Sequence, residues 1–234
     1  MAEFTDRTVI VTGGCGALGT AVAGHLLKRG ARVAIPAYSE KEVERFEHAS
    51  NPAVTIVIGV DLTDEAATES FYSQHAADGL WASIHVAGGF AMSPLGETSA
   101  DEFDRMMAMN TRSCFLCCRH AAARMGPEGG RLVNVAARVG LVPEDGAGMA
   151  PYTASKAAVA ALTMALGTEL KGQGIWVNAV APSIMDTEAN RAAMPAADHD
   201  DWPSTEDVAE TICFLASPGN KTTRSAVVPV YGRS

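Results

Sequence analysis

The sequence has no long apolar run and no cluster of basic residues, and these absences exclude several classes of protein. No segment approaches the roughly 18 consecutive apolar residues that a membrane-spanning helix needs. The N-terminal stretch MAEFTDRTVIVTGG lacks the basic and apolar regions of a secretion signal, so we expect a cytoplasmic protein. The formal net charge is −9 without any block of Lys or Arg, which argues against nucleic-acid and membrane partners.

Cysteine usage excludes a disulfide-stabilised fold. The five cysteines are an odd number without the spacing of a disulfide framework, so reduced thiols are expected. Cys114, Cys117 and Cys118 share one helical segment, but the sequence shows no Cys or His pair at ligand spacing that converges on them. They are therefore interpreted as small buried residues, and no metal site is predicted.

Short β-branched runs alternate with longer helix-like segments along the whole chain. The expected strands, each interpreted as buried on both faces, are 7–13, 31–36, 53–59, 81–88, 131–137, 175–182 and 225–232. The expected helices are 17–30, 39–49, 63–79, 100–126, 151–174 and 204–220. This alternation predicts an α/β fold, with an open parallel sheet of seven strands and helices on both faces. No linker interrupts it, so residues 1–234 are expected to form a single domain, with a short substrate lid at about 183–203.

The first expected strand runs directly into TGGCGALG (12–19) and then into a helix. Glycines at such a turn let the backbone approach a pyrophosphate, and the N-terminus of the helix supplies N–H groups for the anion. Because the motif follows the first strand of the alternation, it predicts nucleotide binding. At the end of the second strand, Ala37 and Tyr38 stand where an acidic residue or an arginine commonly selects NAD or NADP. Ser39 and Lys41 are candidates to approach a 2′-phosphate, and the choice of cofactor stays open.

Tyr152 and Lys156 lie four residues apart at the start of the alanine-rich segment PYTASKAAVAAL. Residues at this spacing share one face of a helix, so both side chains can point into one cleft. A lysine ammonium stabilises a nearby phenolate and lowers the tyrosine pKa from about 10 toward neutrality. The pair therefore predicts proton transfer to a bound ligand.

Seven strings together resemble the short-chain dehydrogenase/reductase family in their order and approximate spacing. They are TGGCGALG, DLTD (61–64), HVAGG (85–89), MN (109–110), RLVNVAA (131–137), YTASK (152–156) and NAVAPSIMDT (178–187). The resemblance covers essentially the whole chain. It implies a Rossmann-type sheet in the order 3-2-1-4-5-6-7 that binds NAD(H) or NADP(H). It also implies a homodimer or homotetramer formed through the helices 101–125 and 151–171.

The resemblance assigns roles to individual residues. Tyr152 would donate the proton, Lys156 would hold Tyr152 and the nicotinamide ribose, and Asn110 would hold a water in a proton relay. The implied cofactor-binding residues are Gly13, Gly16, Ala17, Leu18, Gly19, Tyr38, Asp61, Leu62, Ala87, Gly88, Tyr152, Lys156, Pro182, Ile184 and Thr187.

The chain departs from the family pattern in three places. Ala17 stands at the middle glycine of the turn, while Gly16 precedes it. Ser183 replaces a common glycine after Pro182. Ala137 replaces the serine whose hydroxyl would donate to the substrate carbonyl, and the segment from there to Tyr152 is about two residues longer than usual.

A missing hydroxyl donor costs a carbonyl reductase on the order of 2 kcal/mol of transition-state stabilisation, whereas an electron-poor substrate tolerates its absence. The quinoid dihydropteridine reductase branch is similar to this chain in GGCGALG, in VAGGFA, in the serine-less strand and in DTEANRAAMPAADHDDW. This similarity implies reduction of a quinonoid dihydropterin. The candidate substrate residues are Phe90, Ala137, Arg138, Met185 and Trp202.

Two alternatives stay open at this stage. One is a reductase or dehydrogenase that acts on another carbonyl or alcohol with an incomplete, serine-less set of catalytic residues. The other is a dinucleotide-binding scaffold without catalysis, against which the intact Asn110, Tyr152 and Lys156 argue.

Overall fold

Seven parallel strands form one sheet in the order β3-β2-β1-β4-β5-β6-β7 in the computed structural model, which describes residues 3–77 and 79–234. The strands are β1 (Thr8–Thr12), β2 (Arg32–Ala37), β3 (Val54–Ile58), β4 (Ala82–His85), β5 (Gly130–Val135), β6 (Ile175–Pro182) and β7 (Val227–Val230). All six pairings are parallel, and the reversal of strand order beside β1 is the feature of a doubly wound Rossmann sheet. The predicted fold class and strand order are confirmed.

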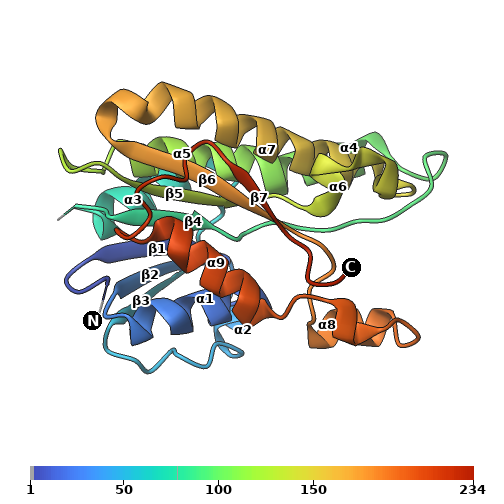
Figure 1. The fold of residues 1–234 in the computed structure, drawn as a ribbon, viewed down its shortest axis with the longest axis horizontal. Helices are drawn as coiled ribbons and strands as arrows, with labels where there is room; N and C mark the ends of the chain where they lie inside the picture. The colour runs from blue at the N-terminus through green and yellow to red at the C-terminus, as the bar shows by residue number, and fades with distance from the viewer. Residues whose placement is uncertain (1–2, 78) are drawn as a thin grey trace.

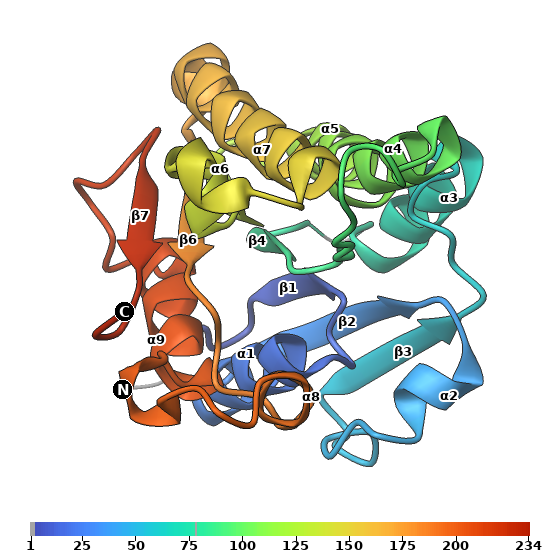
Figure 2. The same ribbon diagram turned by 90° about the vertical axis from the view of Figure 1, so that its right-hand side faces the viewer.

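Helices cover both faces of this sheet (Figures 1 and 2). The α-helices are α1 (Ala17–Lys28), α2 (Glu40–Val43), α3 (Glu65–His75), α4 (Ala100–Met106), α5 (Ser113–Ala122), α6 (Arg138–Leu141), α7 (Ala150–Glu169), α8 (Glu188–Ala193) and α9 (Thr205–Ala216). On one face, α1 and α9 pack together over the sheet and enclose one apolar cluster. On the other face, α3, α5 and α7 enclose a second cluster. None of the helices in the described residues is long and apolar enough to cross a membrane.

Local sequence explains where several helices begin. Asp64, Ser99 and Ser204 each accept a hydrogen bond at the N-terminus of α3, α4 and α9, and so satisfy a backbone N–H that has no partner within the helix. The N-terminus of α1 differs, because Gly16 occupies the capping position and provides no side chain. Its first N–H groups are therefore left for a ligand.

The prediction that all seven strands are buried on both faces is wrong for β3 and β7. These are the two edge strands, and each contains exposed or half-buried residues, with Ile58 48% exposed. The central strands β4 and β5 are buried along their full length, because neighbouring strands and both helical layers cover them.

Three helical segments also differ from the sequence-based expectation. The expected helix 39–49 contains only α2, because the chain turns after it to bury Phe46. The expected helix 100–126 is interrupted by the π-helical turn η1 (Met107–Arg112) between α4 and α5. The irregular stretch 183–203 contains α8 and the short 3-10 turn η4 (His199–Asp201).

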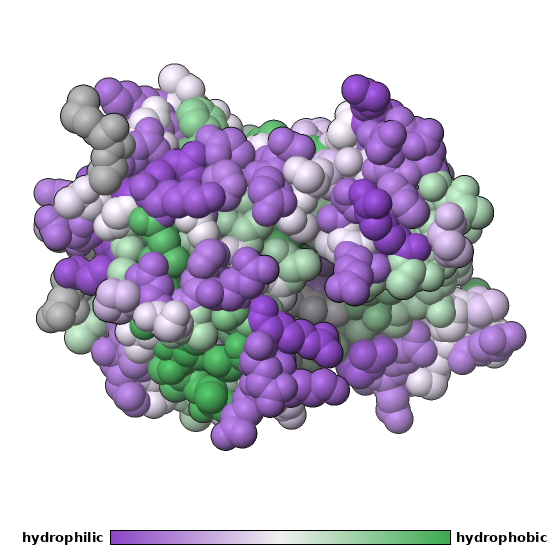
Figure 3. Space-filling model, turned by 90° about the horizontal axis from the view of Figure 1, so that it is seen from below, coloured by the Kyte–Doolittle hydropathy of each residue, from purple (hydrophilic) through white to green (hydrophobic). Residues whose placement is uncertain are grey.

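The segments that the sequence analysis identified as candidate functional segments lie at the carboxyl ends of the strands. In Figure 1 these ends point to the right, where the chain leaves β6 and continues into α8. Seen from below in Figure 3, the surface is mostly hydrophilic and is hollowed right of centre, on this same side. Ligands of open α/β sheets bind at this edge, where the strand order reverses.

Candidate active site

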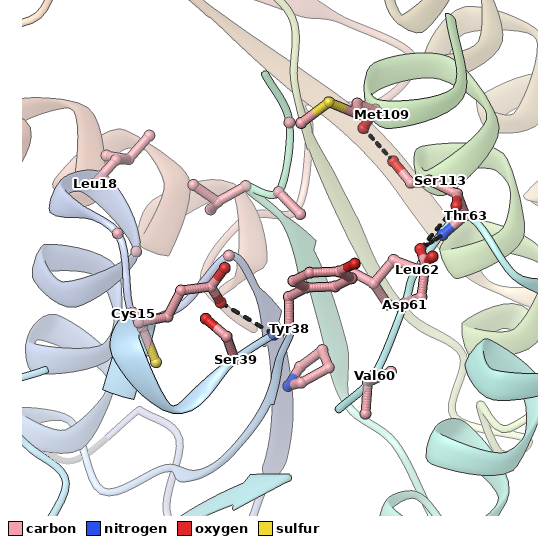
Figure 4. Close-up of a pocket in the computed structure, with 18 of the residues that line it drawn as sticks. Cys15, Leu18, Tyr38, Ser39, Val60, Asp61, Leu62, Thr63, Met109 and Ser113 are labelled. Carbon is pink, nitrogen blue, oxygen red and sulfur yellow. Dashed lines mark hydrogen bonds between the residues drawn. The ribbon is translucent and has the colours of Figure 1, made fainter. Parts of the chain in front are cut away.

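A cavity of roughly 780 Å³ lies along the carboxyl ends of β1, β2 and β4. Figure 4 shows its lining drawn from the glycine turn, the end of β2, the segment after β3 and the π-helical turn. Ten residues predicted to bind the cofactor line it, namely Gly13, Gly16, Ala17, Leu18, Gly19, Tyr38, Asp61, Leu62, Ala87 and Gly88. Its size is that of an ordinary small-molecule or cofactor site.

The glycine turn has little room for side chains. Gly13 has a φ of +64°, and a Cβ there would lie 2.7 Å from the backbone nitrogen of Ala87. A Cβ on Gly19 would lie 2.1 Å from the carbonyl oxygen of Gly13, so only glycine lets α1 start this close to β1. By contrast, a Cβ on Gly16 would meet that oxygen at 3.4 Å. Ala17 is the first residue of α1 and lines the cavity, so its methyl group narrows the space beside the helix N-terminus.

The end of β2 forms the part of the cavity that suits an adenosine ribose. Tyr38 is 66% exposed, and in Figure 4 its ring extends across the cavity toward Asp61 and Leu62. The Tyr38 backbone N–H donates to Glu42 Oε2 at 3.0 Å. Asp61 Oδ1 accepts from both the backbone N–H and the hydroxyl of Thr63, at 2.8 and 2.7 Å, and this fixes the turn that carries Leu62.

Sequence reasoning missed several residues of this lining. Glu42, Arg45 and Ser113 line the cavity but belong to none of the strings that carry a nucleotide motif, and Thr63 lies within DLTD but was not among the predicted cofactor-binding residues. Arg45 lies after α2, where the chain turns back toward the sheet, so its place at the cavity depends on tertiary packing. The run of charged residues at 40–45 was the one feature of the sequence that indicated a role for this segment at the cavity.

Tyr152 lies in the first turn of α7, where Pro151 occupies an early helical position that suits its fixed φ. Its ring makes an edge-to-face contact with Phe90, with centroids 5.0 Å apart. Burial raises the pKa of Tyr152 to about 12. At neutral pH the phenol therefore keeps its proton, which it can give to a developing oxyanion or nitrogen anion.

Lys156 is buried one turn later on α7, and its Nζ donates to the Val135 carbonyl oxygen at 2.8 Å. Burial lowers its pKa to about 8, while the charge of Cys114 acts in the opposite direction. Its Nζ lies 6.0 Å from the centre of the Tyr152 ring. The expectation that this lysine lowers the tyrosine pKa is wrong, because desolvation by burial raises the pKa of Tyr152.

Asn110 is buried in the π-helical turn and joins three parts of the site. Its amide pairs with the backbone of Gly89, accepting from the N–H at 2.9 Å and donating to the carbonyl at 3.0 Å. The same Nδ2 donates to Ser155 Oγ at 3.0 Å, and Ser155 in turn donates to the Tyr152 carbonyl at 2.7 Å. Asn110 thus connects the loop after β4 to the first turn of α7.

The two positions beside the missing serine do not supply an obvious replacement donor. Ala137 is 7% exposed at the N-terminus of α6 and presents only a methyl group. The Arg138 Nε donates to Asp145 Oδ2 at 2.9 Å, and its guanidinium lies 5.1 Å from the Tyr231 ring centre. Ser183, the other departure, donates to the Tyr231 carbonyl oxygen at 2.9 Å, so its hydroxyl ties the end of β6 to the last residues of the chain.

The remaining predicted residues follow β6. Pro182 ends that strand, Ile184 is 43% exposed, and Thr187 accepts a hydrogen bond from the Asn190 backbone at the start of α8. Met185 packs against the apolar cluster under α1 and α9, and the Trp202 ring lies 4.6 Å from that of His199. The structure therefore directs Met185 toward the core and Trp202 toward its own segment.

Comparison with known proteins identifies the family, since the sequence profile described as short chain dehydrogenase matches residues 7–198. The chain belongs to this family. It is 30% identical to the NADPH-dependent aldehyde reductase 2, chloroplastic, of Arabidopsis thaliana, over 98% of this chain and 94% of the relative. It is 33% identical to the cis-4-hydroxycyclohexanecarboxylate dehydrogenase of Sinomonas cyclohexanicum, over 98% and 96%.

A solved structure with a bound nicotinamide cofactor is similar to this chain in three dimensions. The structure of ElxO with NADP bound superposes with a TM-score of 0.88 at 26% identity, over 97% of both chains. Family, fold and cavity together make the protein an NAD(P)-dependent short-chain oxidoreductase that acts on a small molecule.

Proposed function

We propose that this short-chain dehydrogenase reduces a planar, electron-poor, conjugated substrate, and that quinonoid dihydropterin is the specific compound. The observation that carries the proposal is Ala137, two residues after the end of β5, where family members use a serine hydroxyl to polarise a carbonyl. A substrate that already accepts hydride readily needs no such donor, whereas a simple ketone loses part of its transition-state stabilisation.

The surroundings of Tyr152 support a flat substrate. Phe90 is 60% exposed and makes its edge-to-face contact with the Tyr152 ring, so an aromatic surface lies beside the proton donor. Met92 follows it in the same loop, is 64% exposed, and would come within 3.4 Å of a Cβ on Gly148. Exposed aromatic and thioether groups favour an apolar ring face over a polyol or a sugar.

In this proposal, the residues of the chain deliver one proton to the substrate and control its transfer. A reduced nicotinamide, when bound, supplies the hydride. Tyr152 gives its hydroxyl proton to the atom that gains negative charge, so the substrate takes up one hydride and one proton. The Lys156 ammonium stabilises the resulting phenolate and binds the nicotinamide ribose, and Asn110 holds the loop and the first turn of α7 in register for a proton relay to water.

We further propose NADPH as the preferred cofactor. The cations Lys41 and Arg45 line the end of the cavity that suits the adenosine ribose. Glu42 also lines it, but its Oε2 accepts from the Tyr38 backbone, so part of its hydrogen-bonding capacity is already used. The two cations favour a 2′-phosphate, and the aromatic face of Tyr38 suits an adenine ring.

A second candidate function is the interconversion of an ordinary aldehyde, ketone or secondary alcohol. The names of the Arabidopsis and Sinomonas relatives favour it, since they specify an aldehyde reductase and a hydroxycyclohexane dehydrogenase. In this case the enzyme works without the serine hydroxyl at a reduced rate. A non-catalytic dinucleotide sensor remains the alternative from another class.

The experiment that separates these functions is a titration with NADH and with NADPH, coupled to a substrate panel. The panel contains quinonoid dihydropterin, simple aldehydes and ketones, and secondary alcohols assayed with the oxidised cofactors. Turnover of quinonoid dihydropterin well above that of the carbonyls supports the proposal. No pterin turnover in a preparation that binds cofactor and reduces a carbonyl supports the second candidate, and saturable binding without any hydride transfer supports the sensor.

Three further expectations from the sequence are carried forward as proposals. A homodimer or homotetramer would use the faces of α4, α5 and α7, where Phe103, Phe115 and Met164 are partly exposed. The segment 183–203 would close over the substrate as a lid, and the enzyme would reside in the cytoplasm. Light scattering of the purified protein tests the first of these directly.

A further inference from the structure

A buried group of metal-ligating side chains lies between the sheet and α5. His85, at the end of β4, faces Cys114 and Cys118 on α5, and one ligand atom from each lies within 4.8 Å of the other two. All three side chains are buried. The sequence shows no Cys or His pair at ligand spacing, and the single histidine His85 meets these cysteines only because β4 and α5 pack against each other in the fold.

Four potential ligand atoms converge at this point. The Cys118 sulfur lies 3.5 Å from His85 Nδ1 and 3.5 Å from Asn134 Oδ1. Asn134 Oδ1 itself lies 2.7 Å from His85 Nδ1. Cys114 and Cys118 are four residues apart, so their sulfurs share one face of α5. A tetrahedral zinc ion with ordinary bond lengths separates its ligand atoms by about 3.3 to 3.8 Å. The two 3.5 Å separations from the Cys118 sulfur lie in this range, whereas His85 Nδ1 and Asn134 Oδ1 would have to move apart from 2.7 Å when the cation replaces the hydrogen bond between them.

The histidine can present a free nitrogen to this group. The Asn134 amide is held in orientation because its Nδ2 donates to Thr163 Oγ1 at 2.9 Å, and Thr163 donates to the Val159 carbonyl at 2.8 Å. Nδ1 of His85 therefore carries the proton that it shares with Asn134 Oδ1 when no cation is bound. Moving this proton to Nε2 frees Nδ1 to bind a cation.

A hydrogen-bond acceptor for a proton on His85 Nε2 is already in place. Ser83 Oγ lies 2.9 Å from His85 Nε2, and the Tyr72 hydroxyl lies 2.8 Å from Ser83 Oγ. With the proton on Nε2, His85 donates to Ser83, and Ser83 donates to the Tyr72 oxygen. Ligating histidines in metalloproteins characteristically make such a bond from the nitrogen that does not bind the metal.

We propose that His85, Cys114, Cys118 and Asn134 form a structural site for a thiophilic divalent cation, with Zn²⁺ as the ion whose ligand preferences fit best. Two thiolates and an imidazole are the ligand types that Zn²⁺ prefers, and the Asn134 amide oxygen would complete the tetrahedron at the position that a carboxylate oxygen or a water takes in other sites. The two thiolate charges balance the cation, so the buried site carries no net charge.

Cys117, on the same helix, lies outside this group of ligands and interacts instead with the Tyr72 hydroxyl.

The site would join β4, β5 and α5 in the part of the core that also lies near Lys156. Because its ligands are buried, the cation would be taken up as the chain folds, as in other structural metal sites. Its effect would be on stability, and the cation would not touch the substrate.

The proposal is tested with the full chain, unfolded in a chelator and refolded with Co²⁺. We expect one Co²⁺ per chain, with the intense visible bands of tetrahedral thiolate coordination, and displacement of the Co²⁺ by Zn²⁺. Cys114→Ser and Cys118→Ser should abolish the bands, and Ser83→Ala should weaken binding about tenfold by removing the partner of Nε2. Cys117→Ser is the matched control on the same helix and should keep them. Substoichiometric Co²⁺, or bands that persist without Cys114 and Cys118, would overturn the site.

A second measurement does not depend on the folding of a variant. Alkylation of the wild-type thiols in mild denaturant is followed by mass spectrometry, with and without Zn²⁺. The site requires Zn²⁺ to slow modification of Cys114 and Cys118 while leaving Cys213, on the other face of the sheet, unchanged. Equal rates at all of these cysteines with and without Zn²⁺ would contradict it.

Discussion

Lys156 on α7 donates a hydrogen bond from its Nζ to the carbonyl oxygen of Val135, the last residue of β5. This contact attaches the helix that carries both members of the proposed catalytic pair directly to the central sheet. The same Nζ lies over the Tyr152 ring, 6.0 Å from the ring centre, at the outer limit of a cation–π contact. A bound nicotinamide ribose would offer the ammonium further acceptors on the cavity side.

Removing the hydroxyl of Tyr152 tests the proton donor. Tyr152→Phe should lower kcat at least about a hundredfold, because the substrate loses its general acid while the cavity keeps its shape. Steady-state rates give the first effect, and cofactor titration by fluorescence should give an unchanged Kd. Full activity in this variant would exclude Tyr152 as the donor.

Cofactor binding should depend on pH through Lys156. Its pKa is lowered to about 8 by burial, so the ammonium is present below pH 8 and is lost as the pH rises through that value. The Kd of the reduced cofactor should therefore be constant in the acidic range and rise above pH 8. Lys156→Arg keeps its charge throughout this range and should bind cofactor without the alkaline change.

The lowered pKa of Lys156 also predicts how the free energy of unfolding depends on pH. The unfolded chain binds this proton more tightly than the native protein, so the contribution of Lys156 to the free energy of unfolding grows as the pH rises from 8 toward 10.5. Denaturant titrations of wild type and Lys156→Met across this range measure it. Parallel pH dependences of the two proteins would rule out a depressed lysine pKa.

Restoring the family hydroxyl tests the meaning of Ala137. Ala137→Ser should raise kcat/KM for simple aldehydes and ketones by about tenfold to a hundredfold, because a donor aimed at the reacting oxygen stabilises the transition state. Quinonoid dihydropterin should gain much less. Equal gains on both substrate classes would indicate that the missing serine does not select the substrate.

Arg45, at the end of the cavity that suits the adenosine ribose, should help the enzyme to distinguish NADPH from NADH. Arg45→Ala should raise the KM for NADPH about tenfold, through the loss of one charge-assisted bond to phosphate, and leave the KM for NADH unchanged. Arg119→Ala provides a control, since Arg119 forms its ion pair with Glu65 outside the cavity. A preference for NADH in the wild type would contradict the proposed roles of Lys41 and Arg45.

An added methyl group should affect stability differently at two glycines of the turn. Gly19→Ala places a Cβ 2.1 Å from the Gly13 oxygen and should destabilise the fold by about 1 to 3 kcal/mol, with loss of cofactor binding. Gly16→Ala meets the same oxygen at 3.4 Å and should leave stability nearly unchanged. Thermal unfolding of the two variants measures the contrast, and similar melting temperatures would contradict it.

The sequence predicts the sheet well because each buried parallel strand is a short β-branched run, and the glycine turn and the Tyr152–Lys156 pair are local patterns. What it misses depends on contacts between distant segments. Arg45 reaches the cavity only because the chain turns to bury Phe46, and His85 meets Cys114 only through packing of β4 against α5. The π-helical turn at Asn110 likewise has no separate signal within a continuous helical pattern.

All five cysteines of the chain are buried, which has a practical consequence for observing the segment 183–203 in motion. A cysteine introduced at an exposed position of α8, for example by Ala193→Cys, would be the one thiol that a fluorescent maleimide reaches quickly in the native protein. A dye could therefore be attached there without first removing the natural cysteines. Changes in its emission on addition of cofactor and then substrate would report, in real time, whether this segment closes and at which step.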